Sequence, residues 1–103
     1  MNPDVLFKPF NHPKLQLPNR IVMAPMTRQF SPNGIPDENA EQYYRRRAEG
    51  NVGLNITEGS TVNHKAASSA VQIPCFHGEA LEGWEKVVES VHAAGGKIAP
   101  QQR

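Results

Sequence analysis

The sequence has little cysteine, no long apolar run and few aromatic residues. Its single cysteine, Cys75, cannot form a disulfide within the chain. The longest apolar run, residues 21–26, is far shorter than the roughly 20 residues of a membrane-spanning helix. The first residues lack the basic and apolar regions of a secretory signal peptide. We therefore expect a cytoplasmic protein that has no membrane partner.

The chain also lacks an excess of charge. Eleven Lys and Arg against ten Asp and Glu leave a formal charge of +1, and aromatic residues make up 7%. Without a basic stripe, the electrostatic signature of a nucleic-acid-binding protein is missing. The four histidines show no metal-ligand spacing: His12, His64, His77 and His92. We therefore expect neither a nucleic-acid partner nor a metal site.

The most informative stretch is residues 20–28, Arg-Ile-Val-Met-Ala-Pro-Met-Thr-Arg. Its short, partly β-branched apolar run predicts a buried strand at residues 21–24, which Pro25 ends because proline cannot donate to a β-ladder. Thr27 and Arg28 follow the carboxyl end of this strand, where α/β folds place their ligand sites. This edge is the candidate active site.

The segments on either side predict further strands and helices. Before residue 20, Leu6-Phe7 and residues 15–17 are two short strands of a hairpin, with turn residues at 11–13. After a loop at residues 29–36, Asp37 is a helix N-cap, and this helix ends near Gly50 with a cluster of three arginines.

Residues 52–57 then predict a second strand, closed by Glu58-Gly59-Ser60. A long polar connection leads to a second helix, whose apolar positions follow the i, i+3, i+4, i+7 spacing: Trp84, Val87, Val88 and Val91. Gly95-Gly96 ends it, and residues 97–101 are the third strand.

The alternation of strands with helices predicts parallel pairing through right-handed crossovers. We expect one domain over residues 1–103, with a hairpin at 5–18 and a β-α-β-α-β unit at 20–101. Three parallel strands leave two open sheet edges, which offer a route to self-association. We therefore expect the isolated chain to be molten, to aggregate, or to be part of a longer protein.

Several blocks resemble, in order and approximate spacing, the old yellow enzyme family of FMN-dependent oxidoreductases. They are spread along nearly the whole chain: residues 6–10, 15–28, 34–36, 43–48, 53–59 and 84–92. The resemblance implies an α/β fold, the amino-terminal part of a (β/α)8 TIM barrel. A capping hairpin, about three parallel strands and two helices would be present here, whereas a complete barrel has about 250 residues.

The resemblance also implies site residues. Pro25, Met26 and Thr27 would pack against or hydrogen-bond the flavin ring, Gly59 would let the backbone approach it, and Gln101 would hold its pyrimidine edge. Such a ring needs a flat apolar wall and donors aimed at the atoms that gain charge on reduction. The implied cofactors are FMN and, as reductant, NAD(P)H.

The implied reaction is hydride transfer through FMN to a small-molecule substrate, an activated alkene or related acceptor. Thr27 is the catalytic candidate, as the residue that tunes the flavin. The family's tyrosine proton donor and its substrate-binding pair, a His with another His or an Asn, have no counterpart here. After Gln101 the chain also departs from the family's Leu-Trp-His, and the phosphate site that usually follows strands seven and eight is absent. We expect the 103-residue chain to be inactive alone.

For several residues the sequence allows both a structural and a functional role. Glu58 is a structural acceptor for backbone donors or a catalytic carboxylate, and Arg28 contacts the flavin or forms a structural ion pair. Residues 45–47 are a solvated face or an anion site, and Cys75 is an inert thiol.

Two other functions remain open from the sequence. One is a noncatalytic remnant that acts as an interaction module through its open strand edges. The other is a different phosphate-binding barrel or open α/β enzyme, which the missing G-x-G-x-x-G motif disfavours.

Overall fold

The computed structural model describes residues 3–64, 66 and 72–102 of the chain. In chain order its elements are the 3-10 helix η1 (Pro3–Phe7), β1 (Phe10–His12), β2 (Leu15–Leu17), β3 (Val22–Met23), the 3-10 helix η2 (Pro32–Gly34), α1 (Glu38–Glu49), β4 (Leu54–Ser60), α2 (Ala80–Ala93) and β5 (Lys97–Gln102).

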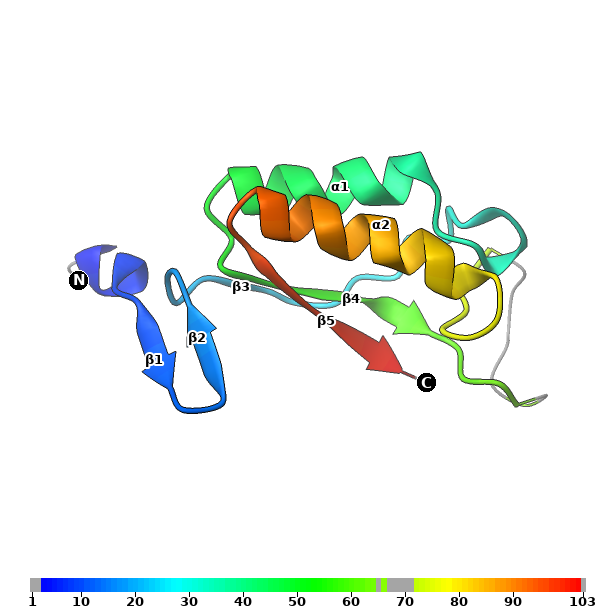
Figure 1. Cartoon of the computed structure of the whole chain (residues 1–103), viewed down its shortest axis with the longest axis horizontal. Coiled ribbons are helices and arrows are strands. Elements are labelled where there is room, and N and C mark those ends of the chain that lie inside the picture. The colour runs from blue at the N-terminus through cyan, green and yellow to red at the C-terminus, as the bar shows by residue number, and fades with distance from the viewer. Residues whose placement is uncertain (1–2, 65, 67–71, 103) are drawn as a thin grey trace.

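A parallel sheet is the centre of the fold. Its strands lie in the order β3-β4-β5, and α1 and α2 cover one face of it (Figure 1). The β1-β2 hairpin lies beyond the end of the sheet at which these strands begin, and β4 and β5 run away from it (Figure 1). The predicted β-α-β-α-β order and parallel pairing are confirmed.

The hairpin is present, but its first strand was predicted at the wrong residues. Leu6 and Phe7 lie in η1, and the strand that pairs with β2 is β1. A tight turn pairs the residues that directly flank it, so Leu15 faces His12 and the pairing never reaches back to η1. Leu17 is buried, whereas Leu15 remains 41% exposed.

The boundaries of all three parallel strands also differ from the prediction. Only Val22–Met23 of the expected strand at 21–24 pairs with β4, which begins at Leu54 rather than at residue 52. Glu58-Gly59-Ser60 does not close this strand, because the register with β5 shifts after Ile56 and pairing resumes at Gly59 and Ser60. After the shift, Gly59 pairs with Gln101 and Ser60 pairs with Gln102, so β4 extends to Ser60 and β5 to Gln102.

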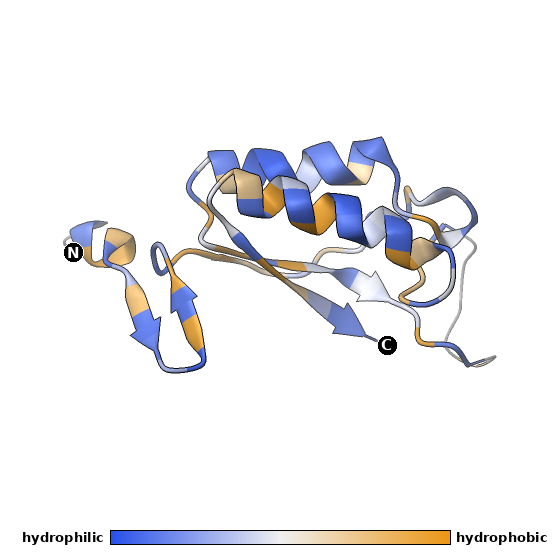
Figure 2. Ribbon diagram, in the orientation of Figure 1, coloured by the Kyte–Doolittle hydropathy of each residue, from blue (hydrophilic) through white to orange (hydrophobic). Residues whose placement is uncertain are grey.

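The helices form as their end signals predict. The Asp37 carboxylate caps α1 by accepting the N–H groups of Asn39 and Ala40, at 3.0 and 3.4 Å. Much of the visible face of α1 is hydrophilic, whereas apolar segments recur along α2 (Figure 2). Buried side chains of both helices form the core: Ala40, Tyr44, Ala48, Ala80, Trp84, Val87 and Val91. Val88, predicted on the same stripe, is half-buried.

The two faces of the sheet differ. Met23 and Ile98 pack against the helical core, and Asn55 Nδ2 donates to the Tyr44 carbonyl, so this row of side chains faces the helices. Because side chains alternate along a strand, the preceding row faces the opposite side, where Val22 is 49% exposed. None of the helices in the described residues is long and apolar enough to span a membrane.

Candidate functional site

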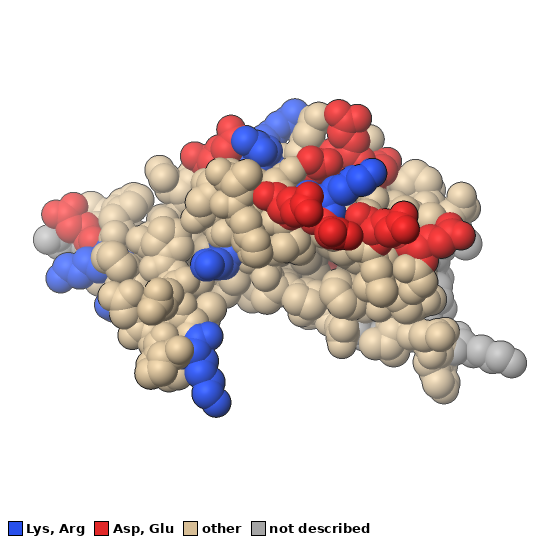
Figure 3. Space-filling view, in the orientation of Figure 1, with Lys and Arg blue, Asp and Glu red and all other residues tan. Residues whose placement is uncertain are grey.

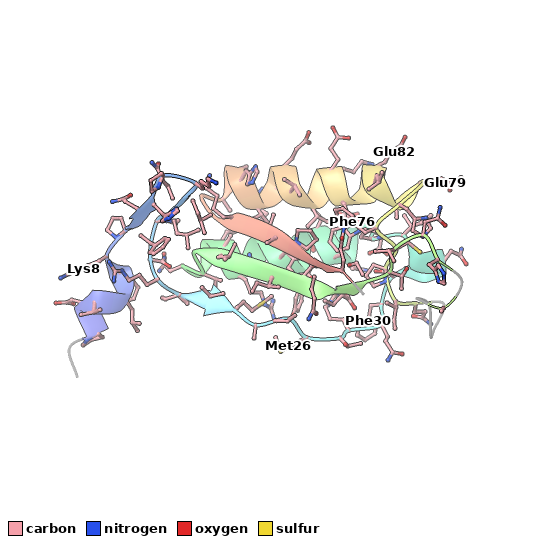
Figure 4. The ribbon with its side chains drawn as sticks, turned by 90° about the horizontal axis from the view of Figure 1, so that it is seen from below. Lys8, Met26, Phe30, Phe76, Glu79 and Glu82 are labelled. Carbon is pink, nitrogen blue, oxygen red and sulfur yellow. The ribbon has the colours of Figure 1, made fainter. Side chains whose placement is uncertain are left out.

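The carboxyl ends of the three parallel strands carry the predicted site residues. Gly59 in β4 is directly paired with Gln101 in β5, so these two are neighbours across the sheet. Gly59 is buried, Pro25 is half-buried, and Met26, Thr27 and Gln101 are exposed. Met26 and Phe30 lie along the loop that follows β3 (Figure 4). The side chains of Met26, Thr27 and Gln101 thus do not pack into the helical core and remain accessible to a ligand.

Glu58, in β4, binds the loop that follows β3 through hydrogen bonds. Its side chain is only 1% exposed, and its Oε2 accepts the backbone N–H groups of Arg28 and Gln29, at 2.9 and 3.2 Å. Its Oε1 lies 3.7 Å from Nη1 of Arg28. The geometry favours the structural interpretation of both Glu58 and Arg28. Thr27 directly precedes this tethered residue, and Gly59 directly follows Glu58 in β4.

One aromatic residue of α1, Tyr43, contacts the Arg28 guanidinium. This guanidinium lies 4.1 Å from the centroid of the Tyr43 ring, and the guanidinium of Arg47 lies 3.8 Å from the same centroid. Arg45 pairs with Glu49 at 2.9 Å on the exposed side of α1. The three consecutive arginines at residues 45–47 therefore serve different contacts.

Two hydroxyl groups complete the link between strands. The Tyr44 hydroxyl accepts the Glu58 N–H at 3.0 Å, and burial raises the pKa of Tyr44 to about 12. Thr57 Oγ1 accepts the backbone N–H of Gln101 at 3.1 Å and donates to the Glu58 carbonyl. Sequence reasoning missed these roles, although Thr57 and Tyr44 both stand within the blocks noted above.

The remaining candidates lie apart from this edge. The Cys75 carbonyl accepts Trp84 Nε1 at 2.7 Å, which ties the Cys75 backbone to α2. Among the described residues no group of three His, Cys, Asp or Glu side chains is placed to hold a metal ion. In Figure 3 acidic side chains gather over the helix layer, whereas the surface over β4 and β5 is mostly uncharged.

This edge suits a flat, partly polar ring. Met26, 52% exposed, offers an apolar surface, Thr27 an exposed hydroxyl and Gln101 an exposed amide. Gly59 has no side chain but is itself buried, so the exposed groups at this edge come from the other segments. These are the groups that a flavin ring needs, an apolar wall with donors beside it.

Known proteins match this chain along nearly its whole length. Residues 5–102 match the model of the NADH:flavin oxidoreductase / NADH oxidase family. The 12-oxophytodienoate reductase 7 of Oryza sativa subsp. japonica is 38% identical over 92 residues, which are 88% of this chain and 23% of that protein. A probable flavin mononucleotide-dependent alkene reductase of Leishmania infantum is 34% identical over 96 residues, 92% of this chain and 26% of that protein.

A solved structure is also similar. Morphinone reductase in complex with tetrahydroNAD superposes with a TM-score of 0.82 at 43% identity, covering 94% of this chain and 26% of the other. The chain thus spans about a quarter of the length of the relatives that it matches.

Proposed function

The chain belongs to the NADH:flavin oxidoreductase / NADH oxidase family, and from this premise we propose that it is the amino-terminal part of an FMN-dependent reductase, in which its strand tips form one wall of the flavin site. The resemblance stated above is confirmed, as is the α/β fold of a partial TIM barrel. FMN and a nicotinamide reductant are the cofactors of this family.

One observation carries the proposal for the site. The residues assigned to the flavin by resemblance come from three separate segments, yet Gly59 pairs with Gln101, and Glu58 binds the backbone next to Thr27. A ring can therefore contact all three segments at one edge of the sheet.

Each residue then has a role toward the ring. Pro25 and Met26 supply the apolar wall, the Thr27 hydroxyl donates a hydrogen bond, Gly59 admits the ring to the backbone, and the Gln101 amide binds its polar edge. Bound FMN would supply two-electron hydride chemistry, which no side chain provides. NAD(P)H as the hydride source and an activated alkene or related small molecule as the acceptor complete the proposal.

Other expectations are part of the same proposal. We assign the proton donor and the phosphate site to other parts of the barrel, and we expect the chain alone to be inactive. A cytoplasmic location and self-association through strand edges also remain proposals.

FMN titration tests the wall with two matched substitutions, in the protein expressed from its complete coding region. Met26 and Leu81 are similarly exposed, at 52% and 46%, but Leu81 lies on α2. We expect Met26→Glu to weaken FMN binding about tenfold or more, because it places a charge against an apolar ring surface. Leu81→Glu should change the affinity less than about twofold.

Fluorescence quenching of added FMN measures both affinities. Equal affinities for the two variants would remove Met26 from the site. No quenching by the unsubstituted protein at high micromolar FMN would refute the flavin site and leave the interaction module as the better interpretation.

A further inference from the structure

We propose that Glu58 is a positioning residue that sets the Thr27 hydroxyl for FMN. The inference rests on the proposed function and deepens it. A carboxylate that is 1% exposed needs compensating partners, because burial penalises its charge. The printed contacts of the Glu58 carboxylate are with Arg28 and Gln29, in the loop after β3, so its charge acts directly on the segment that follows Thr27.

The backbone after Thr27 is shaped to receive an anion. Gln29 has φ of 59°, in the left-handed region that residues other than glycine adopt at a cost. The successive N–H groups of Arg28 and Gln29 converge on Oε2 of Glu58. Successive N–H groups in such a turn form an anion-binding concavity. Here the anion is the chain's own carboxylate, which stabilises the turn.

The side chain of Arg28 makes a second contact between this turn and Glu58. Its Nη1 lies 3.7 Å from Oε1 of Glu58, and its guanidinium lies over the Tyr43 ring at 4.1 Å. Arg28 is therefore held through both its backbone and its side chain. Because consecutive Cα atoms are about 3.8 Å apart, holding Arg28 restricts where the Cα of Thr27 can lie.

Glu58 also reaches the third strand tip. Its carbonyl accepts the Thr57 hydroxyl at 3.0 Å, and Thr57 Oγ1 accepts the N–H of Gln101 at 3.1 Å. Glu58 is thus hydrogen-bonded both to the loop that follows Thr27 and, through Thr57, to Gln101. Stability alone does not explain this carboxylate, since apolar residues of similar volume often replace a buried ion pair without loss of stability.

The test measures the midpoint potential of bound FMN in the protein expressed from its complete coding region. We expect Thr27→Ala to lower the potential. E58Q has two effects: it loosens the turn, which lowers the potential through Thr27, and it removes a nearby negative charge, which raises the potential directly. The direct effect is the difference between the double variant and Thr27→Ala; once it is subtracted, E58Q should lower the potential by at least half as much as Thr27→Ala. Additive shifts, which make this corrected E58Q effect zero, would overturn the proposal.

A matched control and a rescue separate positioning from stability. E82Q removes an exposed carboxylate on α2 and should leave the potential unchanged. Gln29→Gly should restore part of the potential lost in E58Q, because glycine adopts the left-handed turn without help. If E58Q alone does not fold, the double variant E58Q/Gln29→Gly is compared with Gln29→Gly instead.

Hydrogen–deuterium exchange of residues 26–30 tests the same idea without flavin. We expect exchange about tenfold faster in E58Q, because two charge-assisted hydrogen bonds are weakened, and no change in E82Q. If the protein binds no FMN, the proposed function fails, and this measurement still decides whether Glu58 orders the loop. Unchanged exchange in E58Q would refute that role.

Discussion

Replacing Tyr44 by phenylalanine removes one oxygen atom from the core and leaves the aromatic ring in place. The Tyr44 side chain is almost fully buried, and its hydroxyl accepts the Glu58 N–H at 3.0 Å. Without that oxygen the buried N–H has lost its partner, which costs about 1–3 kcal/mol. The ring contact with Trp84 remains, since it does not need the hydroxyl. We expect Y44F to lower the free energy of unfolding by that amount.

The neighbouring residue provides the control. Tyr43 is half-buried, and its ring carries the guanidinium groups of Arg28 and Arg47. Tyr43→Phe keeps this ring, so we expect a change within about 0.5 kcal/mol. Urea unfolding followed by circular dichroism compares the two variants in the protein expressed from its complete coding region. Equal losses of stability for Y44F and Tyr43→Phe would refute the reasoning from the Tyr44 hydroxyl.

The same hydroxyl predicts a pH dependence. Burial raises the pKa of Tyr44 to about 12 in the folded protein, whereas a tyrosine in an unfolded chain has a pKa of about 10. The neutral hydroxyl is therefore favoured by folding. Its contribution is complete below pH 10 and is lost as the pH rises towards 12, in total about 2–3 kcal/mol. Because Y44F cannot ionise there, its stability deficit should shrink above pH 10, and a constant deficit would contradict the assignment.

Three further substitutions test the core, a helix end and the site. Trp84→Ala should destabilise the protein by about 3–5 kcal/mol in urea unfolding, because Trp84 is 4% exposed; the exposed Leu81, changed to alanine, should cost far less. Asp37→Ala should cost about 1 kcal/mol by the same assay, because it removes the acceptor of two helix N–H groups. Thr27→Ala should leave FMN affinity nearly intact, lower the flavin potential by about 20–45 mV and slow reduction by NAD(P)H, the shift expected from one hydrogen bond to the reduced ring.

Local signals were sufficient for the helices and for the family. Asp37 and its acceptor contacts span three residues, and the apolar stripe of α2 repeats within one or two turns. Such patterns are complete within a short window, so they predict the elements correctly. The order and spacing of the sequence blocks likewise indicated the family, which the match of residues 5–102 confirms.

Strand boundaries and pairing were predicted less accurately than the helices. Leu6-Phe7 was predicted as a strand because its apolar residues resemble one, but strands are defined by their partner. The turn placed β1 opposite β2 and left Leu6 and Phe7 in η1. The extension of β4 past Thr57 similarly depended on a shifted register with β5, which no property of β4 alone reveals.

The sequence by itself determined the order of strands and helices, the helix caps, and the residue types that stand after each strand. Only the tertiary structure decided that Glu58 binds the backbone of residues 28 and 29, thirty and twenty-nine positions earlier, and that Tyr44 and Thr57 join it. The reason is physical. Caps and periodicity depend on neighbours along the chain, whereas a buried carboxylate is satisfied by whichever donors the packed sheet and helices bring within about 3 Å.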